Sequence, residues 1–345
     1  MTFPTFVCQN CGGPLAYKAE VPDRPWCCFA CPSTYLGNAH LIDYLGANGT
    51  QTSDHYSHQW GDGLGFLDFI KKRPAVKSVM PSARLGWDDL FGRIRDRAIR
   101  ENVSVYDAAC GFGGLANELI NEQTANYLQY VGADIHRSLD TIRDELPDFD
   151  RCGSLVRWDI SNPLPIAEKF EYVLCRASLH HTPDPAKSFA SLCAMVKPQG
   201  TVAISVYNKK SICREASDDA LRSVVSRMPV DSAFEVCRQF SDLGKALQKI
   251  EEKVVIASDL PLLGISRGEY HVQELIYYYF LKCFYNDEFG DRYSTLVNFD
   301  WYHPGFAYRY SPEEIECWFR DNDIEILKRM TIDVQHYFEG IKRHE

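Results

Sequence analysis

The chain has 345 residues, enough for one large domain with additions or for two domains. Hydrophobic residues make up 45%, charged residues 24% and the net charge is −10, a composition typical of a soluble globular protein. The acidic charge disfavours a protein that binds nucleic acid through phosphate contacts, and no apolar run of about 18 residues suggests a membrane span. The start, Met1-Thr-Phe-Pro, lacks a basic segment and an apolar core, so we expect no signal peptide.

Five of the 13 cysteines lie in the first 31 residues. Cys8/Cys11 and Cys28/Cys31 form two C-x-x-C pairs with 16 residues (12–27) between them. Four thiolates at this spacing can surround Zn²⁺ as in a zinc ribbon and leave no position open for water, which predicts a structural zinc. Cys27 is an alternative to Cys28, although its spacing is less usual. The other cysteines are scattered singly, as thiols are in the reducing cytosol, so we expect a cytoplasmic protein.

A strand, a tight turn and a helix start are predicted between Val105 and Ile120. Residues 1–35 form the predicted zinc-ribbon-like module, and residues 36–100 a connector with helical stretches. The next segment, Val105-Tyr-Asp-Ala-Ala-Cys-Gly-Phe-Gly-Gly-Leu115, runs from apolar residues through Asp107 into small residues. A helical pattern follows to Ile120. Such a loop lets backbone approach a nucleoside cofactor closely.

Further strands follow, two of which end in acids. Tyr130-Val-Gly-Ala-Asp134 ends in an acid that can accept hydrogen bonds from both ribose hydroxyls. Leu155-Val-Arg-Trp-Asp159-Ile160 is a third short strand that ends in another acid. The fourth strand begins at Glu171 and runs into the loop Leu179-His-His-Thr-Pro-Asp-Pro185.

The rest of the chain returns to strands after a helical stretch. Phe189 to Val196 predicts a helix and Thr201 to Tyr207 a fifth strand. From residue 208 to about 297, apolar residues recur at three- and four-residue spacing, which predicts helices; these are Ala220–Met228, Phe234–Ile250 and Val272–Tyr285. Ser311, followed by proline and two acids, predicts a helix start, and Ile324 to Ile332 a strand.

The stretch from Val105 to Tyr207 resembles the class I S-adenosylmethionine-dependent methyltransferases. The most specific pieces are Asp107-Ala-Ala-Cys-Gly-Phe-Gly113, Leu179 to Pro185 and Val196-Lys-Pro-Gln-Gly200. In that family they are the cofactor loop, the loop after the fourth strand and the turn before the fifth. An NAD-dependent enzyme would instead need G-x-G-x-x-G after its first strand, which this chain lacks.

This resemblance implies the fold class and the domains. The fold would be α/β, with a Rossmann-like class I methyltransferase sheet, a helical insertion and the small N-terminal zinc ribbon. Residues 101–207 and 298–345 would form the core, and 208–297 a helical lid or substrate insertion. The connector, 36–100, would cover the cofactor site.

The resemblance also implies residues that bind S-adenosylmethionine. Asp134 would bind the ribose hydroxyls, Asp107 would orient the ammonium, and Asp159 would accept a hydrogen bond from the adenine amino group. The family loop reads acid-x-Gly-x-Gly-x-Gly, and Ala109 at the first glycine position fits if its φ is negative. The full implied set is Tyr56, Gln59, Trp60, Asp107, Ala109, Gly111, Gly113, Asp134, Ile135, Asp159, Ile160 and Arg176.

The first three members of this set come from a segment ahead of the core. Ser53-Asp-His-Tyr-Ser-His-Gln-Trp60 resembles a segment that packs over the cofactor in related small-molecule enzymes. An aromatic anchor for the connector is the alternative.

Methyl transfer needs positioning and the removal of a proton from the acceptor, a task that suits histidine. His180 and His181 follow the fourth strand, at the sheet edge where ligands bind in α/β folds. A structural role under the cofactor is the alternative for either one. Rival bases are Tyr207 and His303, the latter in the segment Asp300 to Tyr310, which resembles a substrate-facing loop. Arg309 or Arg214 could hold an anionic substrate group.

Three functions remain open at this point. The first is methyl transfer to a small molecule: a sugar, a sugar nucleotide or a natural-product intermediate. The second is RNA methylation with the zinc ribbon as reader, although the ribbon offers only Lys18 and Arg24 against Glu20 and Asp23. The third is a non-catalytic S-adenosylmethionine-binding protein. We expect no nucleic-acid partner and no membrane; the acceptor atom and the oligomeric state stay open.

Overall fold

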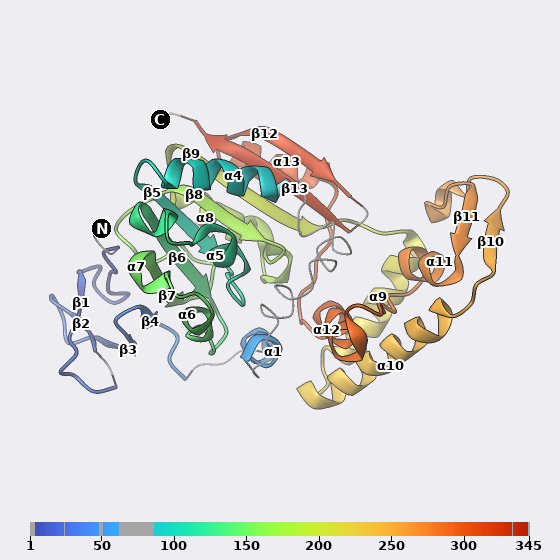
Figure 1. Cartoon of the computed structure of the whole chain (residues 1–345), viewed down its shortest axis with the longest axis horizontal. Helices are drawn as coiled ribbons and strands as arrows, with labels where there is room; N and C mark the ends of the chain where they lie inside the picture. Colours follow the sequence, from blue (N-terminus) through green and yellow to red (C-terminus); the bar gives the residue numbers. More distant parts are fainter. Residues whose placement is uncertain (1–3, 24, 48–50, 62–85, 333, 344–345) are drawn as a thin grey trace.

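A single long sheet runs through most of the molecule (Figure 1). The computed structural model describes residues 4–23, 25–47, 51–61, 86–332 and 334–343, without the side chains of residues 51, 60 and 61. The strands follow the order β1-β2-β3-β4-β7-β6-β5-β8-β9-β13-β12. No helix in these ranges is both long and apolar enough to cross a membrane.

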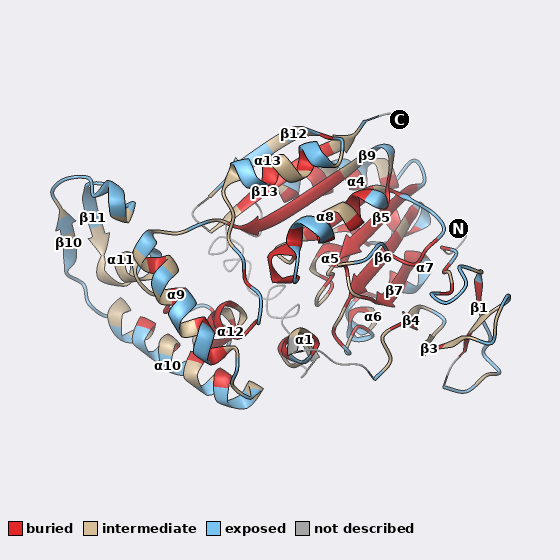
Figure 2. Cartoon of the chain, turned by 180° about the vertical axis from the view of Figure 1, so that it is seen from behind, coloured by how far each residue is buried: buried red, intermediate tan, exposed pale blue. Residues whose placement is uncertain are grey.

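Five parallel strands form the centre of this sheet. They are β5 (Val103–Ala108), β6 (Leu128–Asp134), β7 (Gly153–Arg157), β8 (Phe170–Arg176) and β9 (Val196–Tyr207). Their residues are buried almost throughout, as expected for parallel strands covered on both faces (Figure 2). β5 lies between β6 and β8, so the chain order reverses at β5, and ligands bind beyond the carboxyl ends of strands at such a point.

Helices cover both faces of this sheet. Two hydrophobic clusters divide the core, one built with α4, α5 and α7, the other with α8 and α13. The helices of the core are α4 (Trp87–Ala98), α5 (Gly114–Leu119), α6 (Thr141–Glu145), α7 (Phe149–Cys152), α8 (Pro185–Ala194) and α13 (Pro312–Asp321), with short 3₁₀ turns η2 (Thr124–Asn126) and η3 (Leu179–His181). α8 begins four residues before the predicted Phe189 because Asp184 caps Lys187 N and Pro185 occupies the first turn.

The C-terminal segment completes one side of the sheet. Ser311 forms the predicted cap, a capping box with Glu314, at the start of α13. The strand predicted at 324–332 is confirmed as β12 (Ile324–Thr331). It pairs antiparallel with β13 (Gln335–Lys342), which in turn pairs antiparallel with β9.

The N-terminal segment extends the other side of the sheet. Its strands are β1 (Leu15–Tyr17), β2 (Trp26–Cys28), β3 (Thr34–Asn38) and β4 (Leu41–Asp43). β4 pairs parallel with β7, Leu41 opposite Leu155. The segment 36–100, expected to be a helical connector, therefore begins with sheet, and β4 covers an edge of β7 that would otherwise be open.

Residues 208–297 form a separate helical layer, on the right in Figure 1. Its elements are α9 (Ile212–Val225), α10 (Val230–Gln248), β10 (Lys253–Ile256), η4 (Pro261–Leu263), β11 (Gly268–His271), α11 (Val272–Tyr279) and most of α12 (Gly290–Tyr302). We call residues 208–302 the lid. α1 (Gln51–Gly61) lies between the lid and the core in Figures 1 and 2.

Candidate active site

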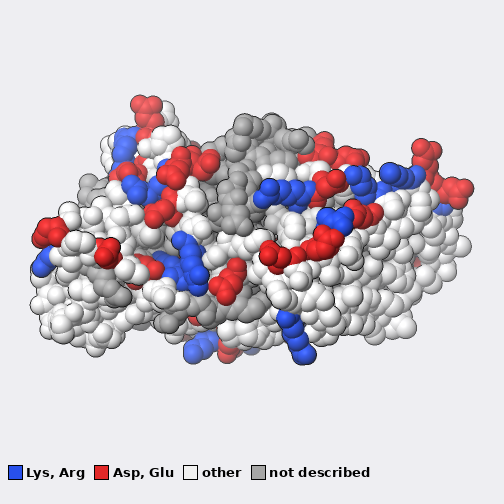
Figure 3. Space-filling view, turned by 90° about the horizontal axis from the view of Figure 1, so that it is seen from below, with Lys and Arg blue, Asp and Glu red and all other residues white. Residues whose placement is uncertain are grey.

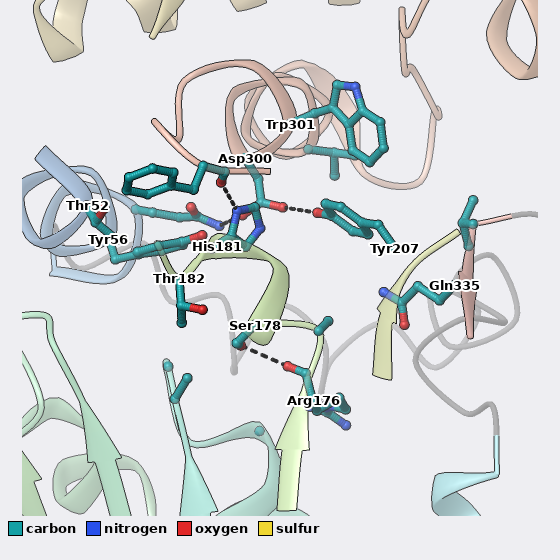
Figure 4. Close-up of a pocket in the computed structure, with 18 of the residues that line it drawn as sticks. Thr52, Tyr56, Arg176, Ser178, His181, Thr182, Tyr207, Asp300, Trp301 and Gln335 are labelled. Carbon is teal, nitrogen blue, oxygen red and sulfur yellow. Dashed lines mark hydrogen bonds between the residues drawn. The ribbon is translucent and has the colours of Figure 1, made fainter. Parts of the chain in front are cut away.

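A cavity of about 750 Å³ lies at the carboxyl ends of the parallel strands. The core contributes one end, the lid the other, and α1 part of the wall between (Figure 4). Of the residues implied by the sequence, those that line it are Tyr56, Gln59, Ala109, Gly111, Asp134, Ile135, Asp159, Ile160, Arg176, His181, Tyr207 and Arg214. Asp107, Gly113, His180 and His303 do not line it, and the side chain of Trp60 is outside the described residues.

The loop between β5 and α5 forms the floor of the core end. Gly111 (φ 54°) and Gly113 (φ 82°) lie in the left-handed region that favours glycine. Ala109 also lies there, with φ 58°, so the expectation of a negative φ at Ala109 is wrong. An alanine in this conformation costs about 1–2 kcal/mol, which the surrounding contacts must offset.

The Asp134 carboxylate ties this loop to the end of β6. One oxygen accepts the N–H of Gly111 at 2.8 Å, and the other accepts those of Ile135 at 2.7 Å and His136 at 3.2 Å. The His136 ring adds a contact of 2.9 Å from Nε2 to the Gly111 carbonyl oxygen. Asp134 is only 6% exposed and that exposure faces the cavity. It is thus both a cavity wall and the anchor of the loop.

Asp107 lies behind the loop instead of in the cavity wall. Its Oδ2 accepts a hydrogen bond of 2.6 Å from the Tyr130 hydroxyl, and its Oδ1 has no partner among the described residues. Burial raises the pKa of Asp107 to about 7, against the opposing effects of Tyr130 and Arg176.

A flat, largely apolar wall stands beyond Asp134. Trp158 and Ile160 line it, and Asp159 stands between them at the cavity surface. β7 ends at Arg157, so Asp159 lies in the turn after the strand and not at the strand end that the sequence predicted. Its Oδ1 accepts the N–H of Ser161 at 2.9 Å.

Arg176 occupies the opposite side of the core end. Its guanidinium lies over the start of α5, so close that a Cβ on Gly114 would be 2.5 Å from Nη2. Among the described residues the guanidinium has no hydrogen-bond partner, and burial lowers the pKa of Arg176. A half-buried cation without a partner suits an anionic ligand group.

α1 is fastened to both the core and the lid. Ser53 donates to the Ile135 carbonyl oxygen at 3.1 Å. Gln59 donates to Asp300 of α12 at 3.2 Å, and its amide oxygen contacts His55, whose other ring nitrogen lies 2.7 Å from His303. These contacts hold α1 over the cavity and give His303 a structural position.

His181 lines the cavity and carries a ring nitrogen without a hydrogen-bond partner among the described residues. Its Nδ1 lies 2.7 Å from the carbonyl oxygen of Phe306, so Nδ1 is the protonated nitrogen and donates. Nε2 is buried and has no partner among the described residues. Burial lowers the pKa of His181, which favours the neutral ring with a lone pair on Nε2. Figure 4 shows the ring beside Tyr56 and Asp300.

The other predicted bases are placed differently. His180 is buried beneath the wall, where its Nδ1 accepts the Tyr207 N–H at 3.4 Å. Tyr207 lines the cavity and donates to Asp300 at 3.0 Å. Burial raises the pKa of Tyr207 well above its usual value, so the phenol stays protonated. Asp300 to Tyr302 belong to α12, so the substrate-facing loop predicted from Asp300 onward is in this part a helix.

The lid adds charged residues that the sequence analysis did not select. Lys282, Lys210 and Asp300 line the cavity. Lys282 interrupts the aromatic run Leu275–Tyr285, and that interruption was the available signal. Arg309 does not line the cavity, because it pairs with Glu215 at 2.7 Å and with Asp219.

Away from the cavity, four thiols meet in the N-terminal segment. The sulfurs of Cys8, Cys11, Cys28 and Cys31 all lie within 4.8 Å of one another, and Cys27 is not among them. The Cys8–Cys31 and Cys11–Cys28 distances are 3.6 and 3.5 Å. Tetrahedral Zn²⁺ with Zn–S bonds of about 2.3 Å requires sulfurs about 3.8 Å apart, so the set fits this ion.

Comparisons with known proteins agree with this geometry. A family model described as a methyltransferase domain matches residues 79–251, half of the chain (173 of 345 residues). Ubiquinone biosynthesis O-methyltransferases of Coxiella burnetii strains are 25% identical over 135 residues, 37% of this chain and 56% of those relatives. The match therefore spans little more than half the length of these curated relatives.

The solved structures that match this chain are less similar to it in sequence. Magnesium protoporphyrin IX methyltransferase from Synechocystis PCC 6803, with bound SAM, is 12% identical with a TM-score of 0.41, over 86% of this chain and 99% of that one. The N-methyltransferase NodS from Bradyrhizobium japonicum WM9, in complex with S-adenosyl-L-homocysteine, is 9% identical with a TM-score of 0.43, over 86% and 100%. We draw nothing on substrates from these two. On the family model and the Rossmann-like sheet, the chain belongs to the class I S-adenosylmethionine-dependent methyltransferase family.

Proposed function

We propose that this chain transfers the methyl group of S-adenosylmethionine to a hydroxyl of a small molecule enclosed in the cavity, with His181 as general base. The observation that carries the proposal is that His181, a residue of the cavity wall, has a buried Nε2 with no hydrogen-bond partner among the described residues. His181 follows β8 of the core and is held by Phe306 next to the lid, so it lies where the two ends of the cavity meet.

The core end suits the cofactor. Asp134 would accept hydrogen bonds from the ribose hydroxyls, and Trp158 and Ile160 would flank the adenine, with Asp159 at its amino group. The unpartnered guanidinium of Arg176 would bind the methionine carboxylate. Ala109, Gly111, Ile135, Tyr56 and Gln59 would complete the walls, while Asp107 and Gly113 would act through the loop they support.

Methyl transfer from S-adenosylmethionine requires few chemical steps of the protein itself. Bound S-adenosylmethionine supplies an electrophilic methyl group. The chain's own residues exclude water, orient the acceptor and remove its proton. His181 can accept that proton at Nε2 because Nδ1 already donates to Phe306, and the nearby Asp300 carboxylate stabilises the imidazolium that forms.

A cavity of about 750 Å³ favours a small acceptor such as a sugar, a sugar nucleotide or a natural-product intermediate. The curated relatives are named as O-methyltransferases, which supports a hydroxyl acceptor. We further propose the division into a ribbon (1–35), a connector (36–100), a core (101–207 and 303–345) and a lid (208–302). The boundary expected between 297 and 298 moves to Tyr302 because α12 runs to that residue.

The two alternative functions have less support. A reader of RNA would present a continuous basic surface, whereas on the face shown in Figure 3 the Lys and Arg side chains alternate with Asp and Glu. A non-catalytic binding protein would not need an unpartnered base beside the cavity.

We also propose that the four thiols hold a structural Zn²⁺ that supports the cofactor wall. Cys8 contacts the Tyr35 hydroxyl at 3.2 Å, the Tyr35 and Tyr44 rings lie 4.8 Å apart, and Tyr44 packs against Trp158 at 5.6 Å. Trp158 lines the cavity. Loss of the ion would loosen this row of aromatic rings.

Asp134→Asn tests the cofactor end. We expect it to weaken binding of S-adenosylhomocysteine about 10- to 100-fold, because a carboxylate acceptor is lost and an N–H₂ group faces the Gly111 N–H. Isothermal titration of the full chain measures this affinity, with Asp144→Asn, at an exposed position, as control.

The ribose contact itself is tested with the 2′-deoxy analogue of S-adenosylhomocysteine. The wild type should prefer S-adenosylhomocysteine to this analogue about tenfold, and Asp134→Asn should not. Equal discrimination in both proteins would refute the ribose contact.

His181→Asn tests the base. The Asn amide can still donate to Phe306, but the Nε2 lone pair is gone. With an acceptor found by screening hydroxylated small molecules for S-adenosylhomocysteine release, we expect kcat to fall about a hundredfold or more while cofactor affinity is kept. Since burial lowers the pKa of His181, the wild-type rate should decline only below the ordinary histidine pKa of about 6.5.

His180→Asn is the matched control for this experiment, because His180 is buried but does not line the cavity. If both variants melt at similar temperatures and only His181→Asn loses activity, the loss comes from the missing base and not from a disturbed fold. A wild-type kcat in His181→Asn would remove His181 from the mechanism.

Cys28→Ser and Cys27→Ser test the zinc. Native mass spectrometry should find one zinc per wild-type chain, one in Cys27→Ser and none in Cys28→Ser. Cys28→Ser should melt several degrees lower and bind S-adenosylhomocysteine a few-fold more weakly, through Trp158. If Cys28→Ser kept the zinc and Cys27→Ser lost it, the fourth ligand would be Cys27 and not Cys28.

A further inference from the structure

The lid end of the cavity is lined by more cationic than anionic side chains. Lys210 precedes α9, Arg214 lies in α9, Lys282 lies between α11 and α12, and Asp300 is in α12. These four are the charged residues of the lid that line the cavity within the described part of the chain. The proposed function assigns this end to the methyl acceptor.

Two of these side chains already have ionic or hydrogen-bonding partners. Arg214 donates from Nε to Asp218 at 2.7 Å, both side chains being buried, and a further guanidinium nitrogen donates to the Tyr277 carbonyl oxygen. Asp300 accepts from Gln59 with one oxygen and from Tyr207 with the other. Neither Arg214 nor Asp300 therefore needs a ligand to satisfy its charge.

Lys282 is different. It is 7% exposed, and among the described residues its ammonium has no hydrogen-bond or ion-pair partner. Its Nζ lies over the face of Trp301, 4.4 Å from the ring centroid. A buried ammonium without an anion is costly, and a cation–π contact offsets only part of that cost.

The charges around Lys282 do not supply the missing anion. Burial has the largest effect and lowers the pKa of Lys282. Arg214 and Lys210 lower it as well, while Asp300 and Asp218 raise it. The result is a pKa of Lys282 lowered to about 7. In the cavity as it stands, this lysine is poised between its charged and neutral forms at neutral pH.

We propose that Lys282 binds an anionic group of the methyl acceptor, a phosphate or a carboxylate, at the lid end of the cavity. This inference rests on the proposed function for the identity of the ligand as methyl acceptor. The aromatic residues Tyr277, Tyr278 and Phe284 line the same end and would pack against the apolar body of that molecule. An anionic acceptor bound there would point its other end toward His181.

The low pKa gives the site a measurable signature. An anion beside Nζ favours the charged ammonium, so it raises the pKa of Lys282 and binding takes up a proton. The contribution of Lys282 to affinity is therefore complete below about pH 7 and is lost as the pH rises through the raised pKa of the complex. Between about pH 7 and that raised pKa, affinity should fall by up to about tenfold for each pH unit, and above the raised pKa it should fall no further.

Two simple anions test the site in the full chain. Sulfate mimics a phosphate and succinate supplies carboxylates, and both keep a constant charge between about pH 7 and about pH 9. Isothermal titration measures each anion with and without saturating S-adenosylhomocysteine, in the wild type, Lys282→Met and Lys282→Arg. Lys245→Met is the control, since this lysine of α10 is paired with Asp291 at 2.7 Å outside the cavity.

We expect at least one anion to bind the wild type, its affinity to drop about tenfold or more in Lys282→Met, and Lys282→Arg and Lys245→Met to keep it. Tighter sulfate would indicate a phosphate-bearing acceptor, and tighter succinate a carboxylate. The pH dependence should vanish in Lys282→Met.

Three outcomes would overturn the inference: no binding of either anion at millimolar concentration, equal binding by Lys282→Met, or displacement of S-adenosylhomocysteine by the anion, which would put the anion at Arg176. The affinity for S-adenosylhomocysteine is measured in the same samples, so that a failure of the anion site can be distinguished from a failure of the proposed function. If the wild type binds the anion but not S-adenosylhomocysteine, the anion site stands and the proposed function fails.

Discussion

Three backbone N–H groups converge on the Asp134 carboxylate, and this contact joins the ends of β5 and β6 where the strand order reverses. It determines the shape of the loop that carries Gly111 and Gly113. It also offsets the left-handed backbone of Ala109, which alone would be strained. Because Asp134 keeps a surface in the cavity, one carboxylate both shapes the cofactor loop and is available to a ligand.

The cavity exists because the lid and α1 close over this edge of the sheet. Asp300 joins α12 to α1 through Gln59 and to β9 through Tyr207, so one half-buried carboxylate connects three elements around the cavity. Polar groups on the wall that find partners stabilise it. Others have no hydrogen-bond partner among the described residues: the Arg176 guanidinium, the Lys282 ammonium, and buried atoms of Tyr56, His181, Trp301 and Gln335. Unsatisfied buried groups are costly, and their concentration on one cavity is best explained by a ligand that satisfies them.

The sequence was enough to predict the parallel core and the loop, because apolar runs, an acid at a strand end and clustered glycines are local signals. It could not choose between His180 and His181, since the orientation of η3 decides which ring meets the cavity. The strands β4 and β13 were not predicted because their stability comes from pairing with strands far away in the sequence. Lys282 was visible only as an interruption of an aromatic run, and its burial depends on the packing of the lid.

The central claim is that one cavity holds the cofactor at the core end and the acceptor at the lid end, with His181 at their junction. A crystal structure of the full chain with S-adenosylhomocysteine tests it most directly. We expect the ribose to lie at Asp134, the adenine to pack against Trp158 and the homocysteine carboxylate to bind Arg176. The lid end in front of His181 should stay open. S-adenosylhomocysteine bound in the lid end, or with its sulfur turned away from His181, would contradict the account.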